Sequence, residues 1–186
     1  MRNTAFLAFG LGLILIQSNL FRLVGYGMVL QQTMFGEMTV AGITPSLLLP
    51  LIVFMGVHEY AMWRGALLSF GLGYLLDVFA SAPIGLYTFT SVAIFVVSRA
   101  AGVRLAAQTL ITKVALAFAF SLLEAVMVII LTAIFGGDAA RPRALAVLVL
   151  PHAVSTAIVA PIVFNLAQRV HQATLTVPGP GEVGGR

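Results

Sequence analysis

The stretch RGALLSFGLGYLLDVFASAPIGLYTF, from Arg64 to Phe89, decides the fold. It is typical of two apolar helices joined by a turn, with one carboxylate, Asp77, set among leucines and glycines. A charge at membrane depth is costly unless it is paired or hydrated, so an acidic residue there is a candidate functional residue. We expect the rest of the chain to pack around this hairpin.

The composition indicates a membrane protein. Of the 186 residues, 60% are hydrophobic and 9% are charged, which leaves too little polar surface to cover a water-soluble domain. There is no Cys, so a disulfide framework, a thiolate metal site and a cysteine nucleophile are excluded. The basic residues lie at the edges of apolar runs rather than on one face, which argues against nucleic-acid binding. The composition therefore predicts a polytopic protein whose main environment is the lipid bilayer.

Six apolar segments can be drawn as membrane helices, given that about 20 apolar residues cross roughly 30 Å of hydrocarbon. They are residues 4–24, 42–57, 65–80, 83–97, 110–135 and 144–166. The second, third and fourth are short. We expect them to be either thinner spans or helices inside the bundle, which is allowed where protein rather than lipid surrounds them. The first resembles the apolar region of a signal peptide, but no A-x-A-like cleavage site follows it, so we expect it to be a retained helix.

The distribution of Lys and Arg favours six spans over five. Seven of these residues fall on one side of the drawn membrane and three on the other. The seven are Arg2, Arg64, Arg99, Arg104, Lys113, Arg169 and Arg186, and the three are Arg22, Arg141 and Arg143. The positive-inside rule then places both termini in the cytoplasm. Five spans, with the C-terminus outside, is the main alternative.

Residues 1–171 are predicted to form one transmembrane domain. The Gly- and Pro-rich residues 172–186 are predicted to form a disordered cytoplasmic tail.

Asp77 is expected toward the external end of the third span, because it follows Arg64 by 13 residues, roughly 20 Å of helix. A carboxylate near a helix C-terminus also meets the negative end of the helix dipole. We therefore expect a nearby group to compensate the negative charge of Asp77. The candidates are the cation of Arg22, a hydroxyl of Ser81 or Thr88, and the free backbone amides of the turn. The alternative is a hydrated Asp at an interfacial turn.

Glu124 is the second acidic residue of interest. It follows Lys113 by 11 residues, about 16 Å into the fifth span and so near the middle of the bilayer. We expect it to be protonated or hydrogen-bonded within the bundle. A proton or ligand site would use such a group, and so would a structural bond between helices. Because no second acid and no Lys or Arg lies buried beside it in sequence, structure or partner contact is favoured over transport.

The sequence contains no catalytic constellation. It has no G-x-S-x-G elbow, no P-loop and no G-x-G-x-x-G after a strand. His58 and Glu59 begin an H-E-x-x-H motif, but Met62 stands where the second His is required. His152, next to Pro151 in the sixth span, is expected to be a packed or water-linked residue. The sequence therefore predicts no enzyme, no cofactor and no metal site.

Residues Pro45 to Arg104 resemble the MreD family, the small multi-pass rod-shape-determining membrane proteins of bacteria. The pattern is a Pro followed by leucines, a polar turn with Arg-Gly, a glycine-rich span ending in Leu-Leu-Asp, and a turn closing with Pro-x-Gly-Leu. In this chain it consists of Pro45, Leu47 to Leu49, Arg64-Gly65, Gly71, Gly73, Leu75-Leu76-Asp77, Pro83-Ile84-Gly85-Leu86 and the later Arg99. The spacing from Asp77 to Pro83 and Gly85 is its most specific part. Ser81 departs from the pattern, where Gly is more usual.

The resemblance implies a non-enzymatic scaffold of the cell-elongation machinery in the bacterial cytoplasmic (inner) membrane, one that helps to position peptidoglycan synthesis. It implies the bitopic protein MreC as the first partner, and also actin-like MreB, a RodA-type glycosyltransferase and its penicillin-binding transpeptidase. The implied fold is an all-α integral membrane protein, a six-transmembrane-helix bundle similar to the substrate-binding subunit of energy-coupling-factor transporters.

The candidate structural or partner-binding residues under this interpretation are Gly71, Gly73, Asp77, Pro83, Gly85, Arg22 and Glu124. The alternative function is a small-molecule-binding membrane subunit of a vitamin-type transporter. In that case Asp77 and Glu124 would line a pocket.

Overall fold

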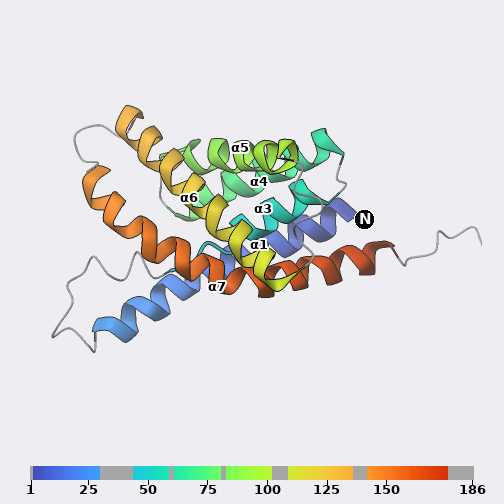
Figure 1. The fold of residues 1–186 in the computed structure, drawn as a ribbon, viewed down its shortest axis with the longest axis horizontal. Helices are drawn as coiled ribbons and strands as arrows, with labels where there is room; N and C mark the ends of the chain where they lie inside the picture. The colour runs from blue at the N-terminus through green and yellow to red at the C-terminus, as the bar shows by residue number, and fades with distance from the viewer. Residues whose placement is uncertain are drawn as a thin grey trace, which may run out of the picture.

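The computed structural model describes residues 2–29, 44–58, 61–80, 83–101, 109–135 and 142–175, without the side chains at 2, 21–29, 142–148 and 175. These residues form six α-helices and no strand (Figure 1). The helices are α1 (Arg2–Val29), α3 (Leu48–Val57), α4 (Met62–Phe79), α5 (Leu86–Ala100), α6 (Leu110–Phe135) and α7 (Pro142–Leu175). The predicted all-helical class is confirmed for this part of the chain.

Each predicted apolar segment overlaps one of the described helices, but most of the helix ends differ from the predicted bounds. The bounds of α6 are those predicted, whereas α7 continues through Arg169 and His171 to Leu175. The predicted boundary after residue 171 therefore falls inside a helix, and residues 176–186 lie outside the described part. Hydropathy marks the stretch that suits lipid, whereas backbone hydrogen bonding continues through good helix formers such as Arg and Gln.

Among the described helices, three are long and apolar enough to cross a membrane. Their apolar stretches are Asn3–Leu20 in α1, Leu110–Phe135 in α6 and Val149–Thr174 in α7, and α3 and α5 are shorter apolar helices. Large apolar side chains also cover the outside of the bundle, among them Ile111, Ile134 and Ile158. Such an apolar exterior fits a protein whose surroundings are lipid rather than water.

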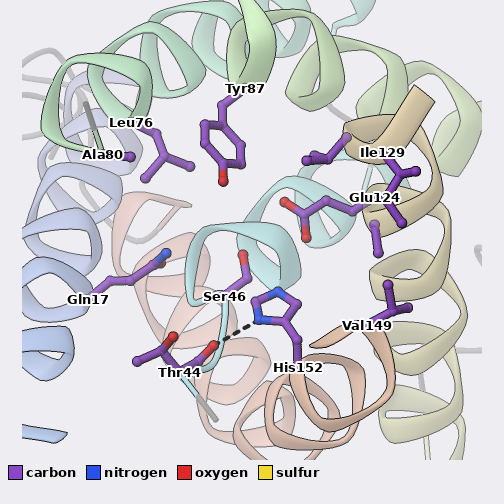
Figure 2. Close-up of a pocket in the computed structure, with 12 residues that line it drawn as sticks. Gln17, Thr44, Ser46, Leu76, Ala80, Tyr87, Glu124, Ile129, Val149 and His152 are labelled. Atoms are coloured by element: carbon purple, nitrogen blue, oxygen red, sulfur yellow. Dashed lines mark hydrogen bonds between the residues drawn. The ribbon is translucent and has the colours of Figure 1, made fainter. Parts of the chain in front are cut away.

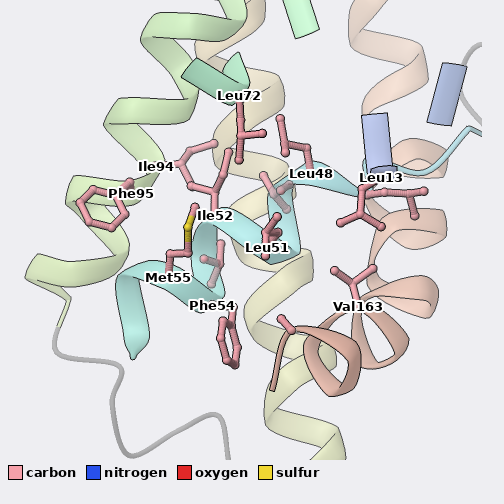
Figure 3. Packing of buried hydrophobic residues seen from close by; sticks show 14 of the residues in the cluster. Leu13, Leu48, Leu51, Ile52, Phe54, Met55, Leu72, Ile94, Phe95 and Val163 are labelled. Carbon is pink, nitrogen blue, oxygen red and sulfur yellow. The ribbon is translucent and has the colours of Figure 1, made fainter. Parts of the chain in front are cut away.

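The short helix α3 lies at the centre of the molecule. All ten of its residues are buried, and it contacts α1, α4, α5, α6 and α7. A helix that is apolar on every side belongs in such an enclosed position. Figure 3 shows its side chains packed among residues of the surrounding helices, including Leu13, Leu72, Ile94, Phe95 and Val163. Pro50 costs no hydrogen bond there, because the first N–H groups of a helix have no partner within it.

Polar side chains of α1 and α7 hold the segment where α3 begins. The Leu47 N–H donates to Gln17 Oε1 of α1 at 2.9 Å, and the Ser46 N–H donates to Thr156 Oγ1 of α7 at 3.0 Å. These side chains satisfy amides that the helix itself cannot. The start of α3 is thereby fixed between the first and last helices.

The remaining helices pack mainly in two pairs, α4 with α5 and α6 with α7. The α4–α5 turn lies at one end of the bundle, and in Figure 1 α1 begins and α7 ends toward the opposite end, on the right of the view. The hairpin that the sequence singled out is thus one of the two principal pairs.

Candidate functional site

The carboxylate of Asp77, in the last turn of α4, accepts hydrogen bonds from residues at the start of α5. Its Oδ2 accepts hydrogen bonds from the Gly85 N–H at 2.9 Å, the Thr88 N–H at 3.1 Å and the Thr88 hydroxyl at 2.6 Å. Its Oδ1 accepts one from the Tyr87 N–H at 2.7 Å. The remaining first-turn amide, that of Leu86, donates to the Pro83 carbonyl at 3.1 Å. Asp77 therefore caps α5 from the neighbouring helix, and all four orphan amides have partners.

This arrangement compensates the buried negative charge of Asp77. The residue is only 1% exposed, so the alternative of a hydrated interfacial Asp does not fit. Its negative charge faces the positive end of the α5 dipole, which offsets its unfavourable place at the end of α4. Two of the expected compensating groups, the turn amides and Thr88, are the observed ones. Ser81 and the Arg22 side chain lie outside the described part of the chain.

Two glycines allow the close geometry of this hairpin. Gly85 has φ of 101°, in the left-handed region that side-chain-bearing residues rarely adopt. At Gly73 a Cβ would lie 2.8 Å from both Thr88 Cα and the Tyr87 carbonyl oxygen, which are backbone atoms of α5. Gly71 is different, because a Cβ there meets nothing within 4 Å. Asp77, Pro83 and Gly85 thus take part in the hydrogen bonds at the start of α5, and Gly73 allows the close approach of α4 to α5 beside them. Gly71 takes part in neither.

A cavity of about 290 Å³ lies between the start of α3 and the helices α1, α4, α5, α6 and α7. Figure 2 shows the polar groups of Tyr87, Glu124, Ser46 and His152 gathered around its interior. The described residues that line it are Gln17, Thr44, Ser46, Leu76, Ala80, Tyr87, Glu124, Ala125, Val128, Ile129, Val149 and His152. Glu124 of the predicted set therefore lines the cavity, whereas Asp77 is not among the lining residues.

Two hydrogen-bond acceptors of the cavity can be identified from chemistry. Glu124 Oε2 is buried and has no hydrogen-bond partner within the described residues. His152 Nδ1 lies 2.8 Å from the Thr44 carbonyl oxygen. Because a carbonyl only accepts, Nδ1 donates, and Nε2 is then the acceptor of the neutral ring. An unpaired carboxyl oxygen of Glu124 and the imidazole lone pair of His152 together favour a ligand that donates hydrogen bonds.

Sequence reasoning missed most of the cavity. Gln17 and His152 stand as polar residues in apolar helices, and that polarity is a signal that could have drawn attention to them. His152, which the sequence predicts to be packed or water-linked, lies with its Nδ1 2.8 Å from the Thr44 backbone carbonyl oxygen, 108 residues away in the chain. Tyr87 gave no signal, since aromatic residues are common in membrane helices.

A cluster of rings lies elsewhere, where α3 ends. The rings of Phe54 and His58 are stacked with centroids 3.9 Å apart, and His171 lies 5.9 Å from His58. Burial lowers the pKa of His58 below its ordinary value, the nearby His171 and Lys113 lower it further, and a hydrogen bond to the Phe54 carbonyl opposes them. In the described residues, no group of three His, Cys, Asp or Glu side chains could hold a metal ion.

No family model, curated protein or solved structure matches this chain. The resemblance to the MreD family therefore rests on the residues between Pro45 and Arg104 alone.

Proposed function

We propose that the chain is a non-enzymatic membrane scaffold of the bacterial cell-elongation machinery, related to the MreD family. The observation that carries the proposal is the Asp77 turn. The most specific part of the family-like pattern is the spacing of Asp77, Pro83 and Gly85, and all three accept or donate hydrogen bonds at the first turn of α5. The three positions of the pattern thus meet at one structural element, the start of α5.

The proposed topology is a six-span bundle similar to the energy-coupling-factor subunit, in the cytoplasmic membrane with both termini cytoplasmic. The Lys and Arg distribution supports it, as does the position of the start of α1 and the end of α7 toward the same end of the bundle. The shortness of α3 is compatible with this topology, because protein encloses the helix on every side.

The proposed first partner is MreC, a protein with a single transmembrane helix. An apolar groove of about 510 Å³ between α6 and α7 offers a place for such a helix. Ala115 and Ala157 lie among its lining residues, and small residues let membrane helices approach closely. MreB, the RodA-type glycosyltransferase and its transpeptidase are further proposed partners, and for these the support is the resemblance.

Co-purification in nanodiscs tests the scaffold function. The full chain is co-expressed with the MreC protein of the same bacterium, and the tagged chain is expected to retain it. Ala115→Leu, which fills the groove, should reduce the retained MreC several-fold. Ala133→Leu, an exposed position of the same helix that does not line the groove, is the matched control. If wild-type protein and MreC do not associate, the proposal is refuted.

A second candidate function is favoured by the Glu124 cavity: a small-molecule-binding membrane subunit of a vitamin-type transporter. Its sign would be a ligand that co-purifies with the chain and raises the midpoint of thermal unfolding. Native mass spectrometry of the purified protein looks for that ligand directly. The two functions separate experimentally, because one requires a protein partner and the other a small molecule.

A further inference from the structure

The cavity contains a buried acidic side chain that no described residue pairs with. Glu124 Oε2 is buried without a partner in the described part of the chain, and the His152 ring uses its Nδ1 proton on Thr44. Gln17 Oε1 is already engaged by the Leu47 N–H. Neither Lys nor Arg occurs among the described lining residues, so these supply no cation to Glu124. The Gln17 amide nitrogen and the hydroxyls of Ser46 and Tyr87 can donate hydrogen bonds in the cavity, but none of them carries a positive charge. What the described lining residues lack is a cation to pair with Glu124.

An ammonium group is such a cation, and it offers three N–H donors and no acceptor. A charge-assisted bond between N⁺–H and a carboxylate is roughly twice as strong as a neutral one. Pairing also removes the penalty of a buried carboxylate with no partner, which is large in a low-dielectric site. The Tyr87 hydroxyl, which points into the cavity in Figure 2, can accept a further N–H.

The rest of the cavity sets the size and character of the ligand. Its walls beyond the polar groups are apolar, formed by Leu76, Ala80, Val128, Ile129 and Val149. The volume of about 290 Å³ lies at the lower limit of the range of ligand pockets, roughly 300–1,000 Å³. A compact molecule with an aromatic or branched hydrocarbon body would fit against these walls.

We propose that this cavity binds a small primary amine, with its ammonium group on Glu124 and His152 and its apolar body against the surrounding aliphatic walls. The site is distinct from the Asp77 turn, whose carboxylate is fully engaged within the chain. The proposal does not rest on the scaffold function. It narrows the ligand class of the second candidate function, and it is compatible with a scaffold that responds to a ligand.

The test uses amines and alcohols of equal shape. Purified full-length chain in nanodiscs is titrated with benzylamine and isobutylamine, and in parallel with benzyl alcohol and isobutanol. The amines are expected to raise the unfolding midpoint in a saturable manner, because a ligand that binds only the folded state stabilises it. The alcohols should bind at least tenfold more weakly, a difference of about 1.4 kcal/mol. Equal effects of amine and alcohol, or no effect of either amine, overturn the proposal.

Variants locate the site. Glu124→Gln keeps the shape of the side chain and removes its charge, and amine affinity should fall at least tenfold while partition into the lipid is unchanged. Ala125→Leu narrows the cavity and should weaken benzylamine more than isobutylamine, whereas Ala133→Leu, exposed on the same helix, should change neither. Undiminished amine binding in both Glu124→Gln and Ala125→Leu would refute the site. If wild-type protein binds no amine but associates with MreC, the amine proposal is refuted and the scaffold proposal is supported. If it binds amines but does not associate with MreC, the scaffold proposal is refuted and the amine site is supported.

Discussion

Asp77 and Tyr87 link the hairpin turn to the cavity. Asp77 Oδ1 accepts the Tyr87 backbone N–H at 2.7 Å, while the side chain of Tyr87 lines the cavity that contains Glu124. The carboxylate on α4 thus fixes the backbone from which a cavity hydroxyl projects. Asp77, which the sequence predicted as a structural or partner-binding residue, therefore also helps to set the geometry of a cavity of which the sequence had predicted only Glu124.

Asp77→Ala should be among the most damaging single substitutions in the chain. It leaves three first-turn amides of α5 without their acceptor, and each buried unsatisfied group costs about 1–3 kcal/mol. We expect the free energy of unfolding to fall by about 3 kcal/mol or more, and MreC association to weaken with it. Asp77→Asn, which retains one oxygen acceptor, should lose less. The measurement is reversible unfolding in mixed micelles. Wild-type stability in both variants would contradict the capping role.

Thr88→Val isolates one bond of the same network. The substitution keeps the side-chain shape and removes the hydroxyl that donates to Asp77 Oδ2 at 2.6 Å. Because hydrogen bonds to charged groups contribute about 1.5–3 kcal/mol, we expect a loss within that range. Combined with Asp77→Ala it should add little, because the partner is already gone, and a double-mutant cycle measures this coupling. Additive effects would show that the bond does not stabilise the fold.

Gly73→Ala and Gly71→Ala form a matched pair two residues apart on α4. A Cβ at residue 73 would come within 2.8 Å of two backbone atoms of α5, which cannot move aside without separating the helices, whereas one at residue 71 meets nothing within 4 Å. Gly73→Ala should therefore destabilise the protein by about 1–3 kcal/mol. Gly71→Ala should be neutral or stabilise it by up to about 1 kcal/mol through helix propensity. Equal unfolding midpoints for the two variants would contradict the close packing.

The sequence predicted the features that depend on local residue patterns, such as the positions of the helices. It did not predict the features that depend on residues far apart in the chain coming together in the fold. Apolar runs located the helices, and the bounds 110–135 of α6 needed only composition. The partners of Asp77 were predictable because a helix start 8 to 11 residues later necessarily presents free amides. The enclosure of α3 was not, since a short apolar segment is equally a thin span or a central helix. The cavity was hidden for the same reason: Thr44 and His152 meet from positions 108 residues apart, and no spacing rule connects them.

His58 should make stability depend on pH. Its ring is stacked on Phe54, and burial together with the nearby His171 and Lys113 lowers its pKa in the folded protein below the ordinary 6.5. The unfolded chain therefore binds the proton more tightly, so the contribution of neutral His58 is fully present above pH 6.5 and is lost as the pH falls toward the lower folded pKa. Unfolding measured from pH 7.5 down to 5 should show falling stability, and His58→Gln should have a shallower slope over that interval because residue 58 no longer titrates. A variant as steep as the wild type would show that other groups, and not His58, take up the proton.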